Sequence, residues 1–181
     1  EPTHQYETIN IFSLNTNHKK GALSFGSETI YNIVNSESNN QENHVWGVGD
    51  TRYPPGGSSL FSTAYYGNVF RRISHKLQLE GGLRYTFSHI MGEYPDSMSR
   101  PIPTIEGLKL SAKNHMFSGN FKFIYHPNDS WKVSAVTARG FHSPNVDDML
   151  KVFRKGDIIT IPNIELKPEY SLSQEVSLSK N

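Results

Sequence analysis

Segments with one apolar face and one polar face recur along this chain, and they are joined alternately by short turns and by long polar loops. Residues 77–88 show the pattern best, because the odd positions are mainly apolar and the even positions are mainly polar. Neighbouring side chains of a β-strand point to opposite faces, so each such strand presents one apolar face and one polar face. The odd positions are Leu77, Leu79, Gly81, Leu83, Tyr85 and Phe87.

The spacing of these segments predicts an antiparallel transmembrane β-barrel segment of about seven strands. Ordinary soluble domains rarely need three structureless loops of 20 to 30 residues. Transmembrane barrels, in contrast, keep short turns at one rim and long loops at the other. The predicted strands are 6–17, 22–37, 60–72, 77–88, 111–125, 131–139 and 169–179; short turns are expected at 19–21, 74–76 and 126–130, and long loops at 38–58, 89–109 and 140–168.

Composition narrows the classes of partner. The chain has 181 residues, of which 35% are hydrophobic and 12% aromatic, which suits a polar interior and aromatic side chains at a membrane interface. The net charge is +1 and no basic stripe occurs, so we expect no nucleic-acid partner. No run approaches the 18 or so apolar residues of a spanning helix, so a membrane would be crossed by strands. Cysteine is absent, which excludes disulfides and Cys-based metal sites.

Charged residues on the predicted polar faces favour a barrel with a water-filled lumen over a β-sandwich, because unpaired charges are costly in the dry core of a sandwich. We expect Arg84 and Arg139 to lie on polar faces or at strand ends and to pair with a lumen carboxylate, such as Glu80 or Glu175. The charged residues on these faces are Glu28, Glu80, Arg84, Lys122 and Glu175.

Two ordered motifs carry a family resemblance. Residues 138–150 read ARGFHSPNVDDML and residues 161–170 read IPNIELKPEY, after the earlier segments GGLRYTFSH and IYHPNDSWKVSAVTARGF. Together they resemble the C-terminal barrel part of TonB-dependent outer-membrane receptors, in which a strand ends in GFRAPN-acid-acid-L and the next begins after NPxLKPE. The segment VDDMLKVF resembles the receptors of Bacteroidetes in particular. His142 and Ser143 stand where the family usually has Arg and Ala.

The resemblance implies a barrel of about 22 strands in the bacterial outer membrane, with short periplasmic turns, long extracellular loops and a plug domain in the lumen. Seven strands cannot close such a barrel, and their exposed edges would be an aggregation hazard. We therefore expect residues 1–181 to be a partial barrel domain without its plug. The implied partners are outer-membrane lipid, the remainder of the barrel, and the TonB energy-coupling complex acting through a plug outside this chain.

The function implied by the resemblance is active uptake of a scarce nutrient, with an iron complex such as a siderophore or haem as the leading candidate. The chain is expected to bind rather than catalyse, and to use no cofactor. Two alternatives stay open: a soluble β-sandwich that binds a ligand or glycan, and an outer-membrane barrel enzyme such as a lipase or protease. No Ser-His-Asp spacing supports the enzyme.

Six loop residues are candidates for ligand contact. The aromatic side chains are expected either to stack on a ligand or to anchor loops to the barrel wall. The basic side chains either attract an anionic iron chelate or form a solvated face. His142 is a candidate haem ligand or a rim histidine, and His44 in the first long loop is a second such candidate. The six residues are Trp46, Tyr53, Tyr94, His142, Lys151 and Arg154.

Two adjacent acids, Asp147 and Asp148, precede a short apolar run. Their neighbourhood lacks the oxygen-ligand spacing of a calcium loop. The eight histidines likewise show no HxH or HExxH spacing that would fix a metal. A general acid/base pair is a further possibility for two adjacent acids, but we interpret them as helix-start or loop-capping residues that precede a brief helix lying on the barrel rim.

Overall fold

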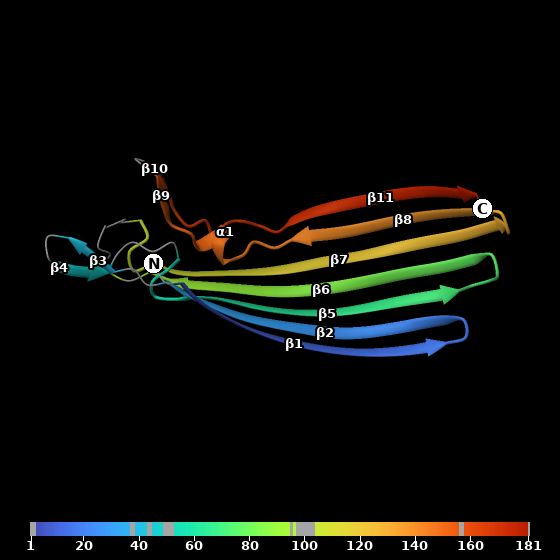
Figure 1. Cartoon of the computed structure of the whole chain (residues 1–181), viewed down its shortest axis with the longest axis horizontal. Helices are drawn as coiled ribbons and strands as arrows, with labels where there is room; N and C mark the ends of the chain where they lie inside the picture. Colours follow the sequence, from blue (N-terminus) through green and yellow to red (C-terminus); the bar gives the residue numbers. More distant parts are fainter. Residues whose placement is uncertain are drawn as a thin grey trace.

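The computed structural model of the chain describes residues 3–36, 39–42, 45–48, 53–94, 96, 104–155 and 158–180. Most of them form one antiparallel sheet of seven long strands, in which every strand lies beside its predecessor in the sheet (Figure 1). These strands are β1 (Thr3–His18), β2 (Gly21–Ser36), β5 (Ser58–Arg72), β6 (Leu77–Glu93), β7 (Lys109–Asn128), β8 (Trp131–His142) and β11 (Glu169–Lys180).

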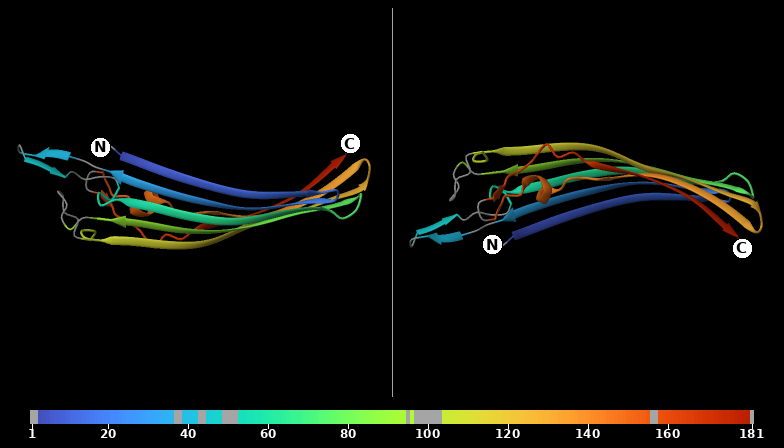
Figure 2. Two further views of the ribbon diagram at one scale, coloured as in Figure 1. Left: turned by 90° about the horizontal axis from the view of Figure 1, so that it is seen from below. Right: turned by 90° about the horizontal axis from the view of Figure 1, so that it is seen from above.

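The sheet is bowed along its length, and its two outermost strands, β1 and β11, are not paired with each other (Figure 2). Among the described residues, no second large sheet packs against it, which separates this fold from the predicted sandwich alternative. The seven predicted strands are therefore confirmed, with ends that differ by a few residues.

All the short turns lie at one end of the sheet and all the long connections at the other (Figure 1). Ser74 Oγ accepts hydrogen bonds from the backbone N–H groups of Lys76 and Leu77 at 3.2 and 3.1 Å, which closes the β5–β6 turn. The third turn is shorter than the predicted 126–130. Strand β7 continues to Asn128 through an irregularity in its pairing with β8, so the turn is 129–130.

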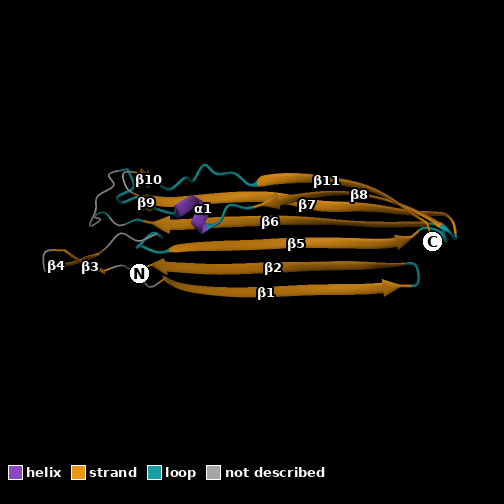
Figure 3. Cartoon of the chain, turned by 45° about the horizontal axis from the view of Figure 1, so that its top comes forward, coloured by secondary structure: helices purple, strands orange, loops and turns teal. Residues whose placement is uncertain are grey.

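The long connections contain the short helix that was predicted and, in addition, small hairpins that were not predicted. Small hairpins and one short helix form within them (Figure 3). Backbone N–H and C=O groups need partners wherever they leave water, and local structure provides those partners. No helix among the described residues is long and apolar enough to cross a membrane. The additional elements are β3 (Asn39–Glu42), β4 (Val45–Val48), α1 (Val146–Leu150), β9 (Phe153–Lys155) and β10 (Ile158–Thr160).

The register gives the main sheet two chemically different faces. Leu83 stands opposite Gly67 on β5 and Gly119 on β7, and the residues flanking it on β6 face the other way. We name the face that carries Leu83 the outer face. Leu83, Leu172 and Val176 on this face are 70–79% exposed. Continuous apolar exposure over many strands marks a surface that meets lipid or protein rather than water. The inner face carries the polar set, as the alternation predicted.

Candidate ligand-binding region

Apolar side chains from the loop end of the sheet form one buried cluster, which we name the cap. Helix α1 contributes three of them and lies over the inner face at that end (Figures 1 and 3). Tyr53 packs against the cluster from the first long connection, and Tyr94 and Ile105 come from the second. All three long connections therefore meet in one place. The buried members are Ile90, Tyr94, Ile105, Leu110, Val146, Met149, Leu150 and Val152.

Helix α1 starts where the sequence predicts. The side chain of Asn145 accepts a hydrogen bond from the backbone N–H of Asp148 at 2.9 Å, and the Asp148 carboxylate accepts one from the Asn145 N–H at 3.0 Å. This reciprocal pair is a capping box, and acidic residues in a first helical turn also suit the helix dipole. The assignment of Asp147 and Asp148 to a helix start is confirmed. The apolar side chains of the helix, Val146, Met149 and Leu150, then face the sheet and are buried in the cap.

Hydrogen bonds join the helix of the cap to the residue that follows β6 and to the first and third long connections. The Tyr94 hydroxyl donates to the Leu150 carbonyl, and its ring is 1% exposed. Burial raises the pKa of the Tyr94 phenol, so it stays a donor at neutral pH. Tyr53 Oη donates to Asp147 Oδ1 at 2.9 Å. The Asn163 N–H donates to the Met149 carbonyl at 2.9 Å, which returns the third connection to the helix.

Two glycines allow this close packing. A Cβ on Gly92 would lie 2.6 Å from Leu150 Cδ1, so the wall can approach the helix only without a side chain there. Gly57 has φ of 95°, a conformation that L-residues rarely adopt. Its carbonyl accepts from the Glu93 N–H at 3.1 Å, which joins the first connection to the end of β6.

The structure brings some of the predicted ligand-contact residues together and separates others. Tyr53 and Tyr94 are both in the cap, and Tyr94 is too deeply buried to stack on an external ligand, so it occupies the wall-anchor position. The Lys151 ammonium lies 3.6 Å from the Asp147 carboxylate. His142, the last residue of β8, is exposed on the inner face opposite Glu169.

The remaining candidates lie in less fully described segments. Trp46 belongs to β4 opposite Gln41, and Arg154 belongs to β9 opposite Ile159, in each case as backbone only. His44 falls outside the described residues. Among the described residues, no three His, Asp or Glu side chains come close enough together to hold a metal ion.

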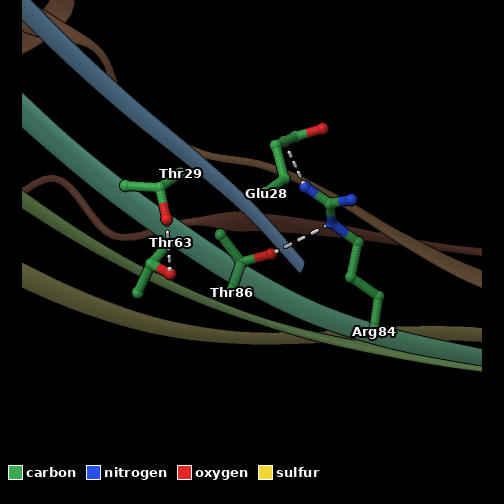
Figure 4. Close-up of polar contacts among 5 residues, drawn as sticks. All are labelled: Glu28, Thr29, Thr63, Arg84 and Thr86. Carbon is green, nitrogen blue, oxygen red and sulfur yellow. Dashed lines mark hydrogen bonds and ion pairs between the residues drawn. The ribbon is translucent and has the colours of Figure 1, made fainter. Parts of the chain in front are cut away.

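The inner face below the cap carries polar contacts around Arg84 that the sequence predicted only in part; Figure 4 shows them together with the Thr29–Thr63 pair of the outer face. Arg84 does face the inner side with the other polar residues, but its partner is Glu28 rather than Glu80. Arg84 Nη2 donates to Glu28 Oε1 at 2.6 Å, and its Nε donates to Thr86 at 3.3 Å. Glu28 and Arg84 lie on strands separated by β5, where Ala64 stands opposite both Glu28 and Thr86 and leaves the space for the pair.

Arg139 was expected to lie on a polar face or at a strand end and to pair with a lumen carboxylate such as Glu80 or Glu175, and the pairing with such a carboxylate is wrong. The register places Arg139 opposite Leu172 and Gly119, on the outer face. Glu175 is on the inner face, opposite Val136. The guanidinium carbon of Arg139 lies 4.2 Å from the centre of the Tyr170 ring.

The cap residues on the strands were missed by the sequence reading. Ile90 and Leu110 occupy positions of the inner face, which is polar elsewhere, and both are at most 5% exposed. Apolar residues that interrupt a polar face near the long loops were the available signal, because only a covering segment can bury them.

Tyr94→Phe is expected to loosen the cap without unfolding the wall. It leaves the buried Leu150 carbonyl without its donor, which costs about 1–3 kcal/mol. Limited proteolysis should therefore cut within 143–168 faster than in the parent protein. Tyr65→Phe, whose ring is 61% exposed on the outer face, is the control and should leave cleavage unchanged. Equal cleavage of the Tyr94→Phe variant and the parent would show that the hydroxyl does not hold the cap.

Comparison with known proteins agrees with this architecture. Residues 2–179 match the family described as TonB dependent receptor-like, beta-barrel. The chain belongs to this family. Its members are receptors and transporters of the outer membrane, so this chain is an outer-membrane protein with periplasmic short turns and extracellular long connections. The outer face of this TonB-dependent receptor barrel faces lipid, and its inner face lines the lumen.

Two relatives illustrate how much of a receptor this chain represents. The "Hemoglobin and hemoglobin-haptoglobin-binding protein" of Haemophilus ducreyi (strain 35000HP / ATCC 700724) is 34% identical over 73 residues, which are 39% of this chain and 8% of that protein. The solved structure of "Copper transporter OprC" superposes with a TM-score of 0.73 at 13% identity, over 99% of this chain and 29% of that one. The likeness to OprC is one of fold alone.

Proposed function

We propose that this chain is a wall segment of a TonB-dependent transporter that takes up a scarce nutrient, an iron complex of the haem or siderophore class. The observation that carries the proposal is the cap. Three extracellular connections meet over the inner face, which is where a ligand entering the lumen must pass. A cap of this kind offers several side chains to one ligand and suits capture rather than catalysis.

The choice of an iron complex is supported by one relative. The Haemophilus protein is named for binding haemoglobin, and the name of OprC adds nothing on substrate because that likeness is of fold. Within the iron complexes, we favour haem over siderophores on this ground. In the proposed cycle, extracellular residues capture the ligand, a plug domain outside these residues is displaced, and the TonB complex supplies the energy.

The residues proposed to meet the ligand surround the cap. His142 is exposed on the inner face, one residue before the segment that leads into α1. Tyr53 is partly buried at the edge of the cap. Trp46, Lys151 and Arg154 complete the proposed set, whereas Tyr94 serves as the buried support beneath it.

The source of iron tests the proposal in the full-length receptor that contains this segment. Iron-starved cells lacking their own copy should grow on haem when the receptor is supplied, and this growth should disappear when TonB is deleted. Copper as the supplement should give no comparable rescue, and rescue by a ferric siderophore in place of haem would assign the ligand to the siderophore class. Equal growth with and without the receptor on every iron source would contradict the proposal.

The role of His142 is tested separately in the same cells. His142→Ala should slow haem-dependent growth, because the variant removes an exposed side chain at the mouth of the lumen. His75→Ala is the matched control, since His75 lies in a short turn at the opposite rim and should be neutral. Identical growth of the two variants would remove His142 from the ligand-contact set, while the comparison of iron sources would still decide the function.

A further inference from the structure

The end of the sheet that carries the short turns has a large excess of positive charge. We name this end the periplasmic rim: the three short turns, the three strand residues on either side of each turn, and the last three residues of β11 (Figure 1). The rim contains seven cations and a single acid, Asp129. All seven cationic residues are exposed, and none of them forms an ion pair within the described residues. The cations are Lys19, Lys20, Arg71, Arg72, Lys76, Lys132 and Lys180.

The rest of the chain has the opposite charge balance. The whole chain has 18 basic and 17 acidic side chains, so outside the rim the acids outnumber the cations by 16 to 11. The near-zero net charge therefore conceals a separation of charge along the strands. A positive potential is concentrated at the periplasmic end, where it attracts anions from the surrounding solution.

The register distributes the rim cations over both faces and the turns between them. Arg71 and Lys180 lie on the outer face, Arg72 and Lys132 lie on the inner face, and the remaining three cations lie in the turns. A lipid headgroup meets the outer-face cations but not the inner ones, and a plug domain meets the inner ones but not the outer ones. The region that all seven positions adjoin is the periplasm beneath the rim.

Hydrogen bonds join the short turns to one another. The Arg72 N–H donates to the Lys20 carbonyl at 2.7 Å, and the His126 N–H donates to the Lys76 carbonyl at 2.8 Å. The Lys76 ammonium also donates to the Pro127 carbonyl at 3.0 Å, which positions its charge without neutralising it. Charges on a fixed backbone lose less conformational freedom when they meet a partner, so the rim is preorganised for binding anions.

The turns lack the features of a compact protein interface. Such interfaces draw most of their binding energy from a few aromatic or arginine side chains that fill pockets. Among the turn residues 19–20, 73–76 and 129–130, the one apolar side chain is Ile73, which is 53% exposed. The others are polar or charged. The rim therefore suits a partner held by many dispersed charges better than it suits an acidic protein.

We infer that the periplasmic rim binds the carboxylates of the peptidoglycan layer, the anionic polymer that lies beneath the outer membrane. Charge complementarity selects this occupant, because carboxylates recur along the polymer as the cations recur along the rim. Each exposed contact is weak, so the affinity comes from their number. The receptor is thereby tethered to the cell wall. The inference rests on the assignment of the short turns to the periplasm and not on the transported nutrient.

Cosedimentation of the purified full-length receptor with isolated peptidoglycan sacculi tests this inference. In neutral detergent at low salt the parent protein should pellet with the sacculi. Roughly 1 M salt, at which the Debye length is about 3 Å, should release it. Sacculi whose carboxylates have been amidated should bind little receptor. The triple variant Lys19→Gln, Lys20→Gln and Lys76→Gln should weaken binding about tenfold, the combined effect of three exposed charge pairs.

Matched variants separate the effect of charge from an effect on folding. Lys113→Gln, Arg139→Gln and Lys167→Gln together remove the same number of exposed cations away from the rim and should leave binding unchanged. Arginine in place of glutamine at the three rim positions keeps the charge and should preserve binding. Heat-dependent mobility on gels checks that each variant is a folded barrel. Absence of binding by the parent at low salt, undiminished binding to amidated sacculi, or equal binding by the two glutamine triple variants would overturn the inference.

Discussion

Leu150→Ala is expected to release the cap from the barrel wall at a cost of about 2–5 kcal/mol. Leu150 is 1% exposed and packs against the wall at Gly92. The wall is held by strand pairing and cannot collapse onto a truncated side chain, so the variant leaves a cavity. Amide hydrogen exchange of the α1 peptide in the full-length receptor should then accelerate roughly thirtyfold or more, since each 1.4 kcal/mol is a factor of ten.

Ile164→Ala is the matched control for this experiment. Ile164 belongs to the same long connection but is 42% exposed, so its truncation removes few buried contacts. Exchange in α1 should be close to that of the parent protein. If the two variants accelerate exchange equally, the cluster around Leu150 does not hold the cap, and the connections are separate loops.

Leu83→Lys is expected to destabilise the barrel by about 2–4 kcal/mol, the usual effect of a cation near the bilayer midplane. Leu83 is 78% exposed on the outer face and lies six residues after the periplasmic start of β6. Its neighbours across both adjacent strands are glycines, so few side chains can shield an ammonium from lipid. Denaturant unfolding of the full-length receptor from lipid vesicles measures the difference in the free energy of unfolding.

Asn120→Lys provides the comparison at nearly the same height. Asn120 stands opposite Gly82 on the inner face and is exposed to the lumen side. An added ammonium there remains near water, so the free energy of unfolding should change by less than about 0.5 kcal/mol. A larger loss for Asn120→Lys than for Leu83→Lys would mean that the two faces are assigned the wrong way round.

The faces of most strands were predictable because a strand has a side-chain period of two. In β6, β7 and β11 most of the residues at every second position are apolar or aromatic over a long stretch, so only one register places them consistently on one face. Strand β8 lacks this contrast. Val133, Ala135, Val136 and Ala138 put small apolar side chains on both faces, and the alternation could not show on which side Arg139 lies. Its cross-strand partners on β11 and β7 decide the face.

The cap and the ion pair of Glu28 and Arg84 on the inner face could not be predicted from the sequence, for a different reason. Glu28 and Arg84 are 56 residues apart, and the contact depends on the intervening strand β5 having a small residue between them. The cap likewise joins three loops that are distant in sequence. The start of α1 at Asp147 and Asp148 is local and was predicted, whereas the surface against which the helix packs depends on long-range contacts that no single segment encodes.

The hydrogen bonds between Gly56, Gly57 and Glu93 have a consequence for binding entropy. A free loop of 20 or more residues loses much conformational freedom when a ligand orders it, and that loss subtracts from the affinity. Here Gly56 and Gly57 of the first connection are bonded to the end of β6, and Asn163 of the third connection is bonded to Met149 in α1. Part of the ordering has already occurred during folding. A ligand that contacts residues beside the cap thus meets a preorganised surface, and each contact contributes more of its gross energy to the measured affinity.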